Sequence, residues 1–319
     1  MAIATFDFEK PIVELENKIE ELEKSPLVPT VEVQKEINEL KEKLAKIRGE
    51  IYSNLTPWQR VQIARHINRP HSYDYITAFI EGFVELHGDR FFGDDPAVIG
   101  GIGSFSGQPV AVIGQQKGKD TKENLARNFG MSHPEGYRKA LRVMKMADKF
   151  NIPILILIDT PGAYPGIGAE ERGQAEAIAK NIREMSTLQV PILIVIIGEG
   201  ASGGALGIGL GDIILMLENA WYCVISPEGC ASILYRDKNL APKAAETLKL
   251  SAPDLLGLKV IDEIVKEPLG GAHRDHQKTF EYVKEAIERN LKKLLSMDTE
   301  TLLKTRFDKY RKMGAFEIV

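Results

Sequence analysis

The sequence predicts an α/β fold in which parallel strands alternate with helices. Three observations lead to this prediction: short apolar runs of strand length recur from about residue 97 onward, stretches with helical periodicity separate them, and glycine-rich loops follow two of the runs. Such alternation is typical of β-α-β units joined by right-handed crossovers. With 319 residues, of which 44% are hydrophobic, the chain is long enough to bury a large core.

Residues 1–60 are predicted to form a helical hairpin. Apolar residues repeat at three- and four-residue steps over residues 12–22 and again over residues 33–51, with Glu and Lys between them. Pro26 and Pro29 interrupt the pattern, which indicates a turn between two helices. The apolar stripe of such a hairpin must pack against the main domain or against a partner.

The main domain is predicted to span residues 61–296. Its apolar runs predict strands at residues 98–102, 109–114, 152–158, 190–197, 213–217, 222–225 and 259–265. Helical periodicity predicts helices at residues 134–150, 169–188, 205–210, 227–234 and 275–295. The remaining residues, 297–319, are charged and are expected to form a peripheral tail.

Two of the predicted strands run into glycine-rich loops. The loops are residues 159–168, DTPGAYPGIG, and residues 197–205, IGEGASGGA. Ligands of open α/β sheets bind at the carboxyl ends of strands, and glycine lets the backbone approach them closely. The helix that follows each loop also begins with unpaired N–H groups. The two loops therefore predict an oxyanion hole or anion site, although tight turns alone would explain either one.

Other classes of site fit parts of these loops. Residues 159–162 resemble the switch motif of GTPases, but the chain lacks the G-x-x-x-x-G-K-[ST] loop that would hold the phosphates. Gly101-Ile102-Gly103 continues as Ser104-Phe105-Ser106, which breaks the G-x-G-x-x-G fingerprint of a dinucleotide fold. Residues 200–204 do fit the G-x-S-x-G spacing of a serine hydrolase. A serine hydrolase would also need a histidine partner for the serine, and none is convincing, because His273 and His276 lie in a predicted polar loop.

Composition excludes several classes of function. A net charge of −4 argues against general nucleic-acid binding. No apolar run is long enough to span a bilayer, and the first residues do not resemble a signal peptide, so a cytoplasmic location is expected. Cys223 and Cys230 are expected to be reduced, and two cysteines without a nearby histidine make a poor zinc site. No metal is expected.

A series of longer motifs follows one another along the chain. They are GQQKG at 114–118, RNFGM at 127–131, PEGYRKA at 134–140, DTPGAYPG at 159–166, AEERGQ at 169–174, IGEGASGGA at 197–205, VISPEGCASIL at 224–234 and EPLGGAHR at 267–274. In this order they resemble the carboxyltransferase alpha-subunit family of the multi-subunit acetyl-CoA carboxylases. Residues 24–35 and the C-terminal segment follow the family least.

The resemblance implies a crotonase-like fold of stacked ββα units, with an active site shared between two subunits. It implies transfer of a carboxyl group from carboxybiotin, held on the biotin carboxyl carrier protein, to acetyl-CoA. The product is malonyl-CoA, in the first committed step of fatty acid biosynthesis. The implied partners are a beta subunit, in a tetramer of two alpha and two beta chains, the carrier protein, and a separate biotin carboxylase that uses ATP. The zinc ribbon of the family belongs to beta.

The resemblance and the loops together suggest the residues of the site. The N–H groups of Gly203 and Gly204 are expected to form an oxyanion hole, and the biotin nitrogen itself takes the methyl proton, so no side-chain base is required. The further candidates for substrate binding are Gly166, Ile167, Ala205, Lys117 and Lys119. Both lysines belong to a basic segment that is as well explained by a solvated face; its members are Lys117, Lys119, Lys122, Arg127, Arg138, Lys139 and Arg142. An acyl-CoA hydratase or isomerase of the same fold, or a scaffold that only positions partners, remains the alternative function.

Overall fold

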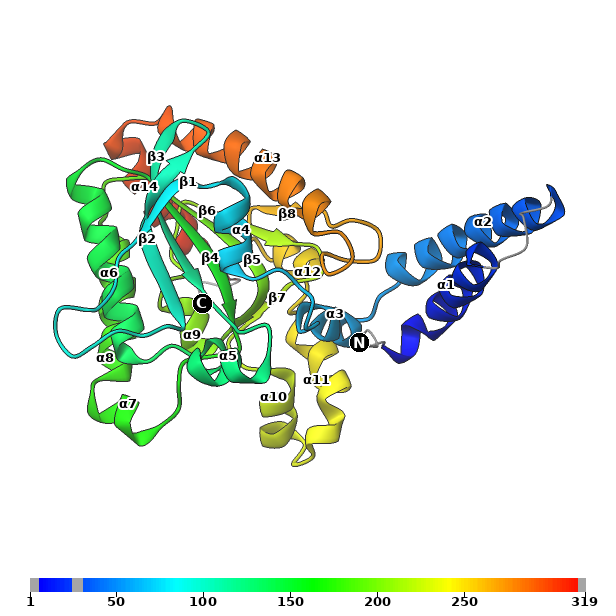
Figure 1. Ribbon diagram of the computed structural model, residues 1–319. Coiled ribbons are helices and arrows are strands. Elements are labelled where there is room, and N and C mark those ends of the chain that lie inside the picture. The colour runs from blue at the N-terminus through cyan, green and yellow to red at the C-terminus, as the bar shows by residue number, and fades with distance from the viewer. Residues whose placement is uncertain (1–5, 25–30, 315–319) are drawn as a thin grey trace.

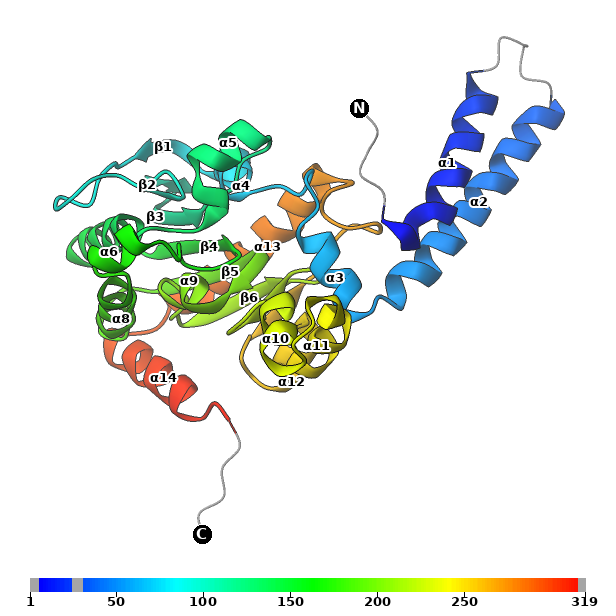
Figure 2. The same ribbon diagram turned by 90° about the horizontal axis from the view of Figure 1, so that it is seen from below.

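The computed structural model describes residues 6–24 and 31–314. A mixed eight-stranded sheet forms its centre, in the order β1-β2-β3-β4-β5-β6-β8, and β7 pairs with the end of β5. Helices cover both faces: α6 and α8 lie on one, and α4 and α13 lie on the other (Figures 1 and 2). The predicted α/β class is confirmed, with antiparallel strands added at one edge.

The strands fall into an antiparallel group and a parallel group. The antiparallel group is β1 (Glu81–Glu85), β2 (Val98–Phe105) and β3 (Gln108–Gln115). Ser106 and Gly107 join β2 to β3 with positive φ angles of 48° and 80°, as a tight hairpin turn requires. The parallel group is β4 (Ile154–Thr160), β5 (Ile192–Ala201), β6 (Ile213–Leu217), β7 (Trp221–Cys223) and β8 (Glu263–Val265).

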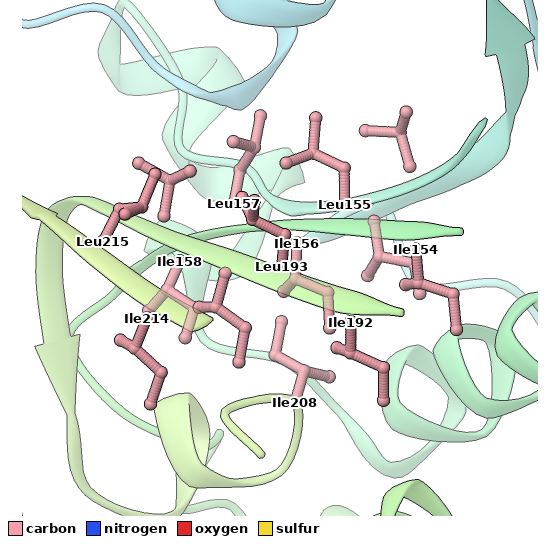
Figure 3. Packing of buried hydrophobic residues seen from close by; sticks show 14 of the residues in the cluster. Ile154, Leu155, Ile156, Leu157, Ile158, Ile192, Leu193, Ile208, Ile214 and Leu215 are labelled. Carbon is pink, nitrogen blue, oxygen red and sulfur yellow. The ribbon is translucent and has the colours of Figure 1, made fainter. Parts of the chain in front are cut away.

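The core lies along the two central strands. Every residue of β4 and of β5 is buried, because helices cover both faces of the sheet here. Isoleucine and leucine side chains from β4, β5 and β6 interdigitate with Ile208 below them (Figure 3). The apolar runs that predicted these strands therefore reflect burial on two sides.

The helices that precede β4 in the chain are α1 (Lys10–Glu23), α2 (Val31–Ser53), α3 (Pro57–Ala64), α4 (Ser72–Phe79), α5 (Thr121–Ala126) and α6 (Pro134–Lys149). The helices that follow β4 are α7 (Ile167–Glu171), α8 (Gln174–Met185), α9 (Ser202–Leu206), α10 (Pro227–Leu234), α11 (Ala241–Leu248), α12 (Ala252–Gly257), α13 (His276–Leu295) and α14 (Thr299–Arg311). The helix expected over residues 169–188 is two helices, because Gly173 adopts a φ of 83° between them.

The predicted hairpin is formed by α1 and α2, which stand away from the body of the molecule (Figures 1 and 2). Its apolar residues pack mainly between the two helices, where Ile12, Ile19 and Ile37 are buried. Arg274 of the main body holds its base by ion pairs with Glu9 and Glu16. The turn expected at Pro26 and Pro29 lies outside the described residues.

The C-terminal segment differs from its prediction. Residues 297–319 were expected to be peripheral, but α14 packs against the body, and Leu302 and Arg306 are buried. Charge does not keep this helix in solvent, because Arg306 has partners for its charge inside the protein. Residues 299–311 therefore form a helix that is held to the body by two buried residues.

Candidate active site

The two glycine loops meet at the carboxyl ends of β4 and β5. Gly204 packs so closely against the first loop that a Cβ there would lie 2.3 Å from the carbonyl carbon of Gly162 and 2.5 Å from the nitrogen of Ala163. Such contact is possible only without a side chain at Gly204. The second loop is shorter than expected, since β5 continues to Ala201 and α9 begins at Ser202.

The turn from β5 into α9 is sharp, and hydrogen bonds from neighbouring side chains fix its position. Ser202 adopts a φ of 58°, a left-handed conformation that non-glycine residues hold only when their surroundings impose it. The carbonyl oxygen of Gly204 accepts a hydrogen bond of 2.7 Å from Gln115 Nε2 and a longer one, 3.4 Å, from Tyr137 Oη. The first N–H groups of α9, from Ser202 to Gly204, have no carbonyl partner within the helix.

A groove of about 580 Å³ opens beside this turn. Ser202 and Gly203 are part of its lining. The rest of its lining is almost wholly apolar and comes from Leu206, Gly209, Ile214, Tyr222, Cys223, Val224, Leu248, Lys249, Leu255, Leu258, Val260, Tyr310 and Met313. An apolar groove lined at one place by the first residues of a helix suits an organic ligand whose reacting atom gains negative charge.

The structure separates the predicted site residues. Gly203 lines the groove, whereas Gly204 and Ala205 are buried behind it. Gly166 and Ile167 lie at the start of α7, and the side chain of Ile167 is 79% exposed. Neither of these two residues lines the groove.

The two predicted lysines make ion pairs instead of facing the groove. Lys119 pairs with Asp74 on the surface. Lys117 reaches inward, where its Nζ lies 2.6 Å from Asp159 Oδ1 and 2.9 Å from Glu199 Oε1. Most other members of the basic segment are also engaged: Arg138 pairs with Asp89, Lys139 with Asp94, and Arg142 bonds the carbonyl of Gly88. Their contacts with the 87–95 loop favour a structural role for the segment.

A buried ionic cluster at the ends of β3, β4 and β5 was missed at the sequence level. Besides Lys117, Asp159 bonds His71 Nδ1 at 2.8 Å, and Glu199 pairs with Arg65 Nε at 2.6 Å. Burial raises the pKa of Asp159, but the Lys117 ammonium and the hydrogen bond from His71 together hold it well below its ordinary value of 3.8. The Asp159 carboxylate also accepts the N–H of Glu199, where β5 bulges relative to β4.

Lys117→Met is expected to weaken the pH dependence that this cluster gives to folding. A carboxyl group with a lowered folded-state pKa stabilises the native protein fully above its ordinary value and loses that contribution only as the pH falls. Without Lys117, the interactions with His71 are left to oppose burial, so the folded-state pKa of Asp159 rises and less stability is lost on acidification. Urea unfolding between neutral pH and about pH 3 measures the difference. A variant that loses as much free energy of unfolding as the wild type over this range would contradict the assignment.

The serine hydrolase and metal interpretations gain no support. Ser202 opens into the groove, but none of the groove's described lining residues is a histidine or a carboxylate that could activate it. Over residues 6–24 and 31–314, no three His, Cys, Asp or Glu side chains are arranged to hold a metal ion. None of the helices in these same ranges is long and apolar enough to cross a membrane.

Comparisons with known proteins identify the family of the chain. Residues 5–314 match the family described as acetyl co-enzyme A carboxylase carboxyltransferase-like. The chain is 59% identical to the acetyl-coenzyme A carboxylase carboxyl transferase subunit alpha of Geobacter metallireducens, with 97% of each chain covered. It is 55% identical to the subunit of the same name from Bacillus subtilis, with 98% of this chain and 96% of that one covered.

Solved structures resemble the fold at low sequence identity. Transcarboxylase 12S with bound methylmalonyl-coenzyme A matches with a TM-score of 0.55 at 18% identity, over 69% of this chain and 41% of that longer one. A Pseudomonas malonate decarboxylase hetero-tetramer in complex with coenzyme A matches with a TM-score of 0.56 at 15% identity, over 68% of this chain and 86% of that chain. These neighbours have the crotonase fold, so the predicted crotonase-like fold is confirmed.

Proposed function

The chain belongs to the family of acetyl-CoA carboxylase carboxyltransferase alpha subunits, and from that membership we propose which parts of it perform the transfer. Carboxybiotin, carried by the biotin carboxyl carrier protein, enters the groove beside α9. A beta subunit presents acetyl-CoA to it, and the product is malonyl-CoA. The observation that carries the proposal is that Gly203, in the first turn of α9, lines the groove and has an N–H group without a helical partner.

Two negative charges develop during this reaction, and each needs a donor. Release of CO2 from carboxybiotin leaves charge on the ureido oxygen, and loss of a methyl proton from acetyl-CoA leaves charge on the thioester oxygen. Fixed backbone N–H groups stabilise such charges without reorganising. In this chain the turn at Ser202 and the hydrogen bond from Gln115 to Gly204 hold α9 in place, so that its N–H groups can stabilise one of the two charges. The biotin nitrogen accepts the methyl proton, and CO2 then bonds to the methyl carbon.

A hydratase of the same fold is not favoured. It would need a carboxylate that is free to take a proton from water beside the donors. The carboxylates nearest to the two loops in sequence, Asp159 and Glu199, are buried, and both are paired with Lys117. Burial raises the pKa of Asp159, but the Lys117 charge lowers it below its ordinary value. A carboxylate with such a lowered pKa is a poor base. The relatives also bear the name of a carboxyltransferase.

The surface around the groove suits a partner chain. Large apolar side chains stand exposed at its rim and on neighbouring α10, among them Leu206, Val224, which is 80% exposed, Ile233, Leu234 and Leu258. Such a patch on a chain with a single set of donors supports completion of the site by the beta subunit. We extend this to the expected tetramer of two alpha and two beta chains.

The purified chain alone is expected to make no malonyl-CoA from acetyl-CoA and carboxybiotin, and addition of the beta subunit is expected to start the reaction. The physical reason is that, among the described residues, the groove is lined by backbone donors of one loop, enough for one of the two oxyanions. Product formation is followed by chromatography while beta is titrated in, with beta alone as the control. Rapid turnover by the chain without beta would refute a shared site.

A further inference from the structure

Helix α14 is anchored to the body by one arginine. Arg306 is only 1% exposed and uses its five N–H donors inside the protein. Its Nε and Nη2 bond the two carboxylate oxygens of Asp212 at 2.8 and 2.7 Å. Its Nη1 and Nη2 reach three carbonyl oxygens at the end of α8 and before β5, those of Met185, Leu188 and Val190. The helix therefore has one fixed position.

The next turn of the same helix reaches the groove. Tyr310 Oη accepts a hydrogen bond of 2.7 Å from the N–H of Gly211 and donates one of 3.1 Å to the carbonyl of the same residue. Tyr310 and Met313 line the groove together with Ser202 and Gly203. The C-terminal helix and the residues just after it thus form a wall of the groove that Gly203 also lines.

We propose that α14 is part of the substrate site, and that Tyr310 and Met313 position the biotin end of the substrate against Gly203. The proposal rests on the proposed function and adds to it a binding role for a segment that the sequence suggested to be a peripheral tail. Among the groove's lining residues Lys249 alone is charged. The phosphates of coenzyme A would need several cations, whereas the ring and aliphatic arm of biotin are uncharged and fit an apolar wall.

The test runs the reaction backwards in the complex of this chain with beta. Malonyl-CoA and free biocytin, which is biotin joined to lysine, give acetyl-CoA and carboxybiocytin, and KM is measured for each substrate in turn. Met313→Ala is expected to raise KM for biocytin about tenfold, because apolar contact with the ligand is lost. Tyr310→Phe is expected to raise it by a smaller factor, since the wall loses its bonds to Gly211 but keeps its ring. KM for malonyl-CoA is expected to stay constant in both variants.

Phe307→Ala is the matched control on the same helix. This side chain is 64% exposed and lies outside the groove lining, so both KM values are expected to equal those of the wild type. Unchanged biocytin KM values in Met313→Ala and Tyr310→Phe would overturn the proposal, as would a rise confined to malonyl-CoA, which would place the acyl-CoA in the groove. A wild-type complex that produces no acetyl-CoA would refute the proposed function itself.

Discussion

Gly204→Ala is expected to lower both the melting temperature and the carboxyltransferase activity, although it adds a single methyl group. The new Cβ would lie 2.3 Å from the carbonyl carbon of Gly162 and 2.5 Å from the nitrogen of Ala163. These are backbone atoms of the first glycine loop, so relief requires the two loops to move apart. Overpacking of this kind costs about 1–3 kcal/mol of stability. Displacement of a backbone donor costs about a hundred- to thousandfold in kcat.

Gly203→Ala separates the two effects. Its Cβ would meet only Ile178 Cδ1, at 3.4 Å, which is an ordinary contact that the flexible end of a side chain can accommodate. We therefore expect this variant to melt close to the wild type and to bind beta, and its kcat then reports the effect of a methyl group in the lining of the groove. Thermal unfolding and malonyl-CoA formation are measured for both variants. A Gly204→Ala protein that melts and turns over like the wild type would contradict the close packing of the loops.

Arg306→Leu is expected to cost about 3–5 kcal/mol of unfolding free energy, because it leaves the Asp212 carboxylate buried without its partner. The three carbonyl groups that Arg306 satisfies would also lose their donor. Urea unfolding monitored by circular dichroism measures the loss. Arg311→Ala, at an exposed position near the end of the same helix, is the control and is expected to change stability by less than about 0.5 kcal/mol. Equal effects of the two substitutions would refute the anchoring role.

The central strands were predictable because burial on both faces leaves an apolar run in the sequence. The end of β5 was not, since its glycines suggest a loop. At Gly198 the Asp159 carboxylate occupies the space that a side chain would need. At Gly200 the Tyr222 ring occupies that space. Both neighbours come from distant parts of the chain. Local patterns cannot report such contacts, so glycines required by packing within a strand resemble glycines that end one.

The ionic cluster and α14 escaped prediction for a related reason. Lys117 and Glu199 are 82 residues apart, and nothing local pairs them. Arg306 lies in a segment rich in charged residues, so this segment resembles a solvated surface. Its partners are carbonyl groups about 120 residues earlier, and backbone carbonyls have no signature in a sequence. The predicted oxyanion donors needed only glycines and a following helix, which are local features.

The anchoring of α14 also constrains how the chain can fold during synthesis. Backbone carbonyls at Met185, Leu188 and Val190 precede the arginine that satisfies them by 121, 118 and 116 residues. Translation must therefore run at least 116 residues past Val190 before these carbonyl groups are satisfied, and until then they depend on water or on a chaperone. A product that stops short of Arg306 would lack this anchor, and proteases would meet an unprotected segment between α8 and β5.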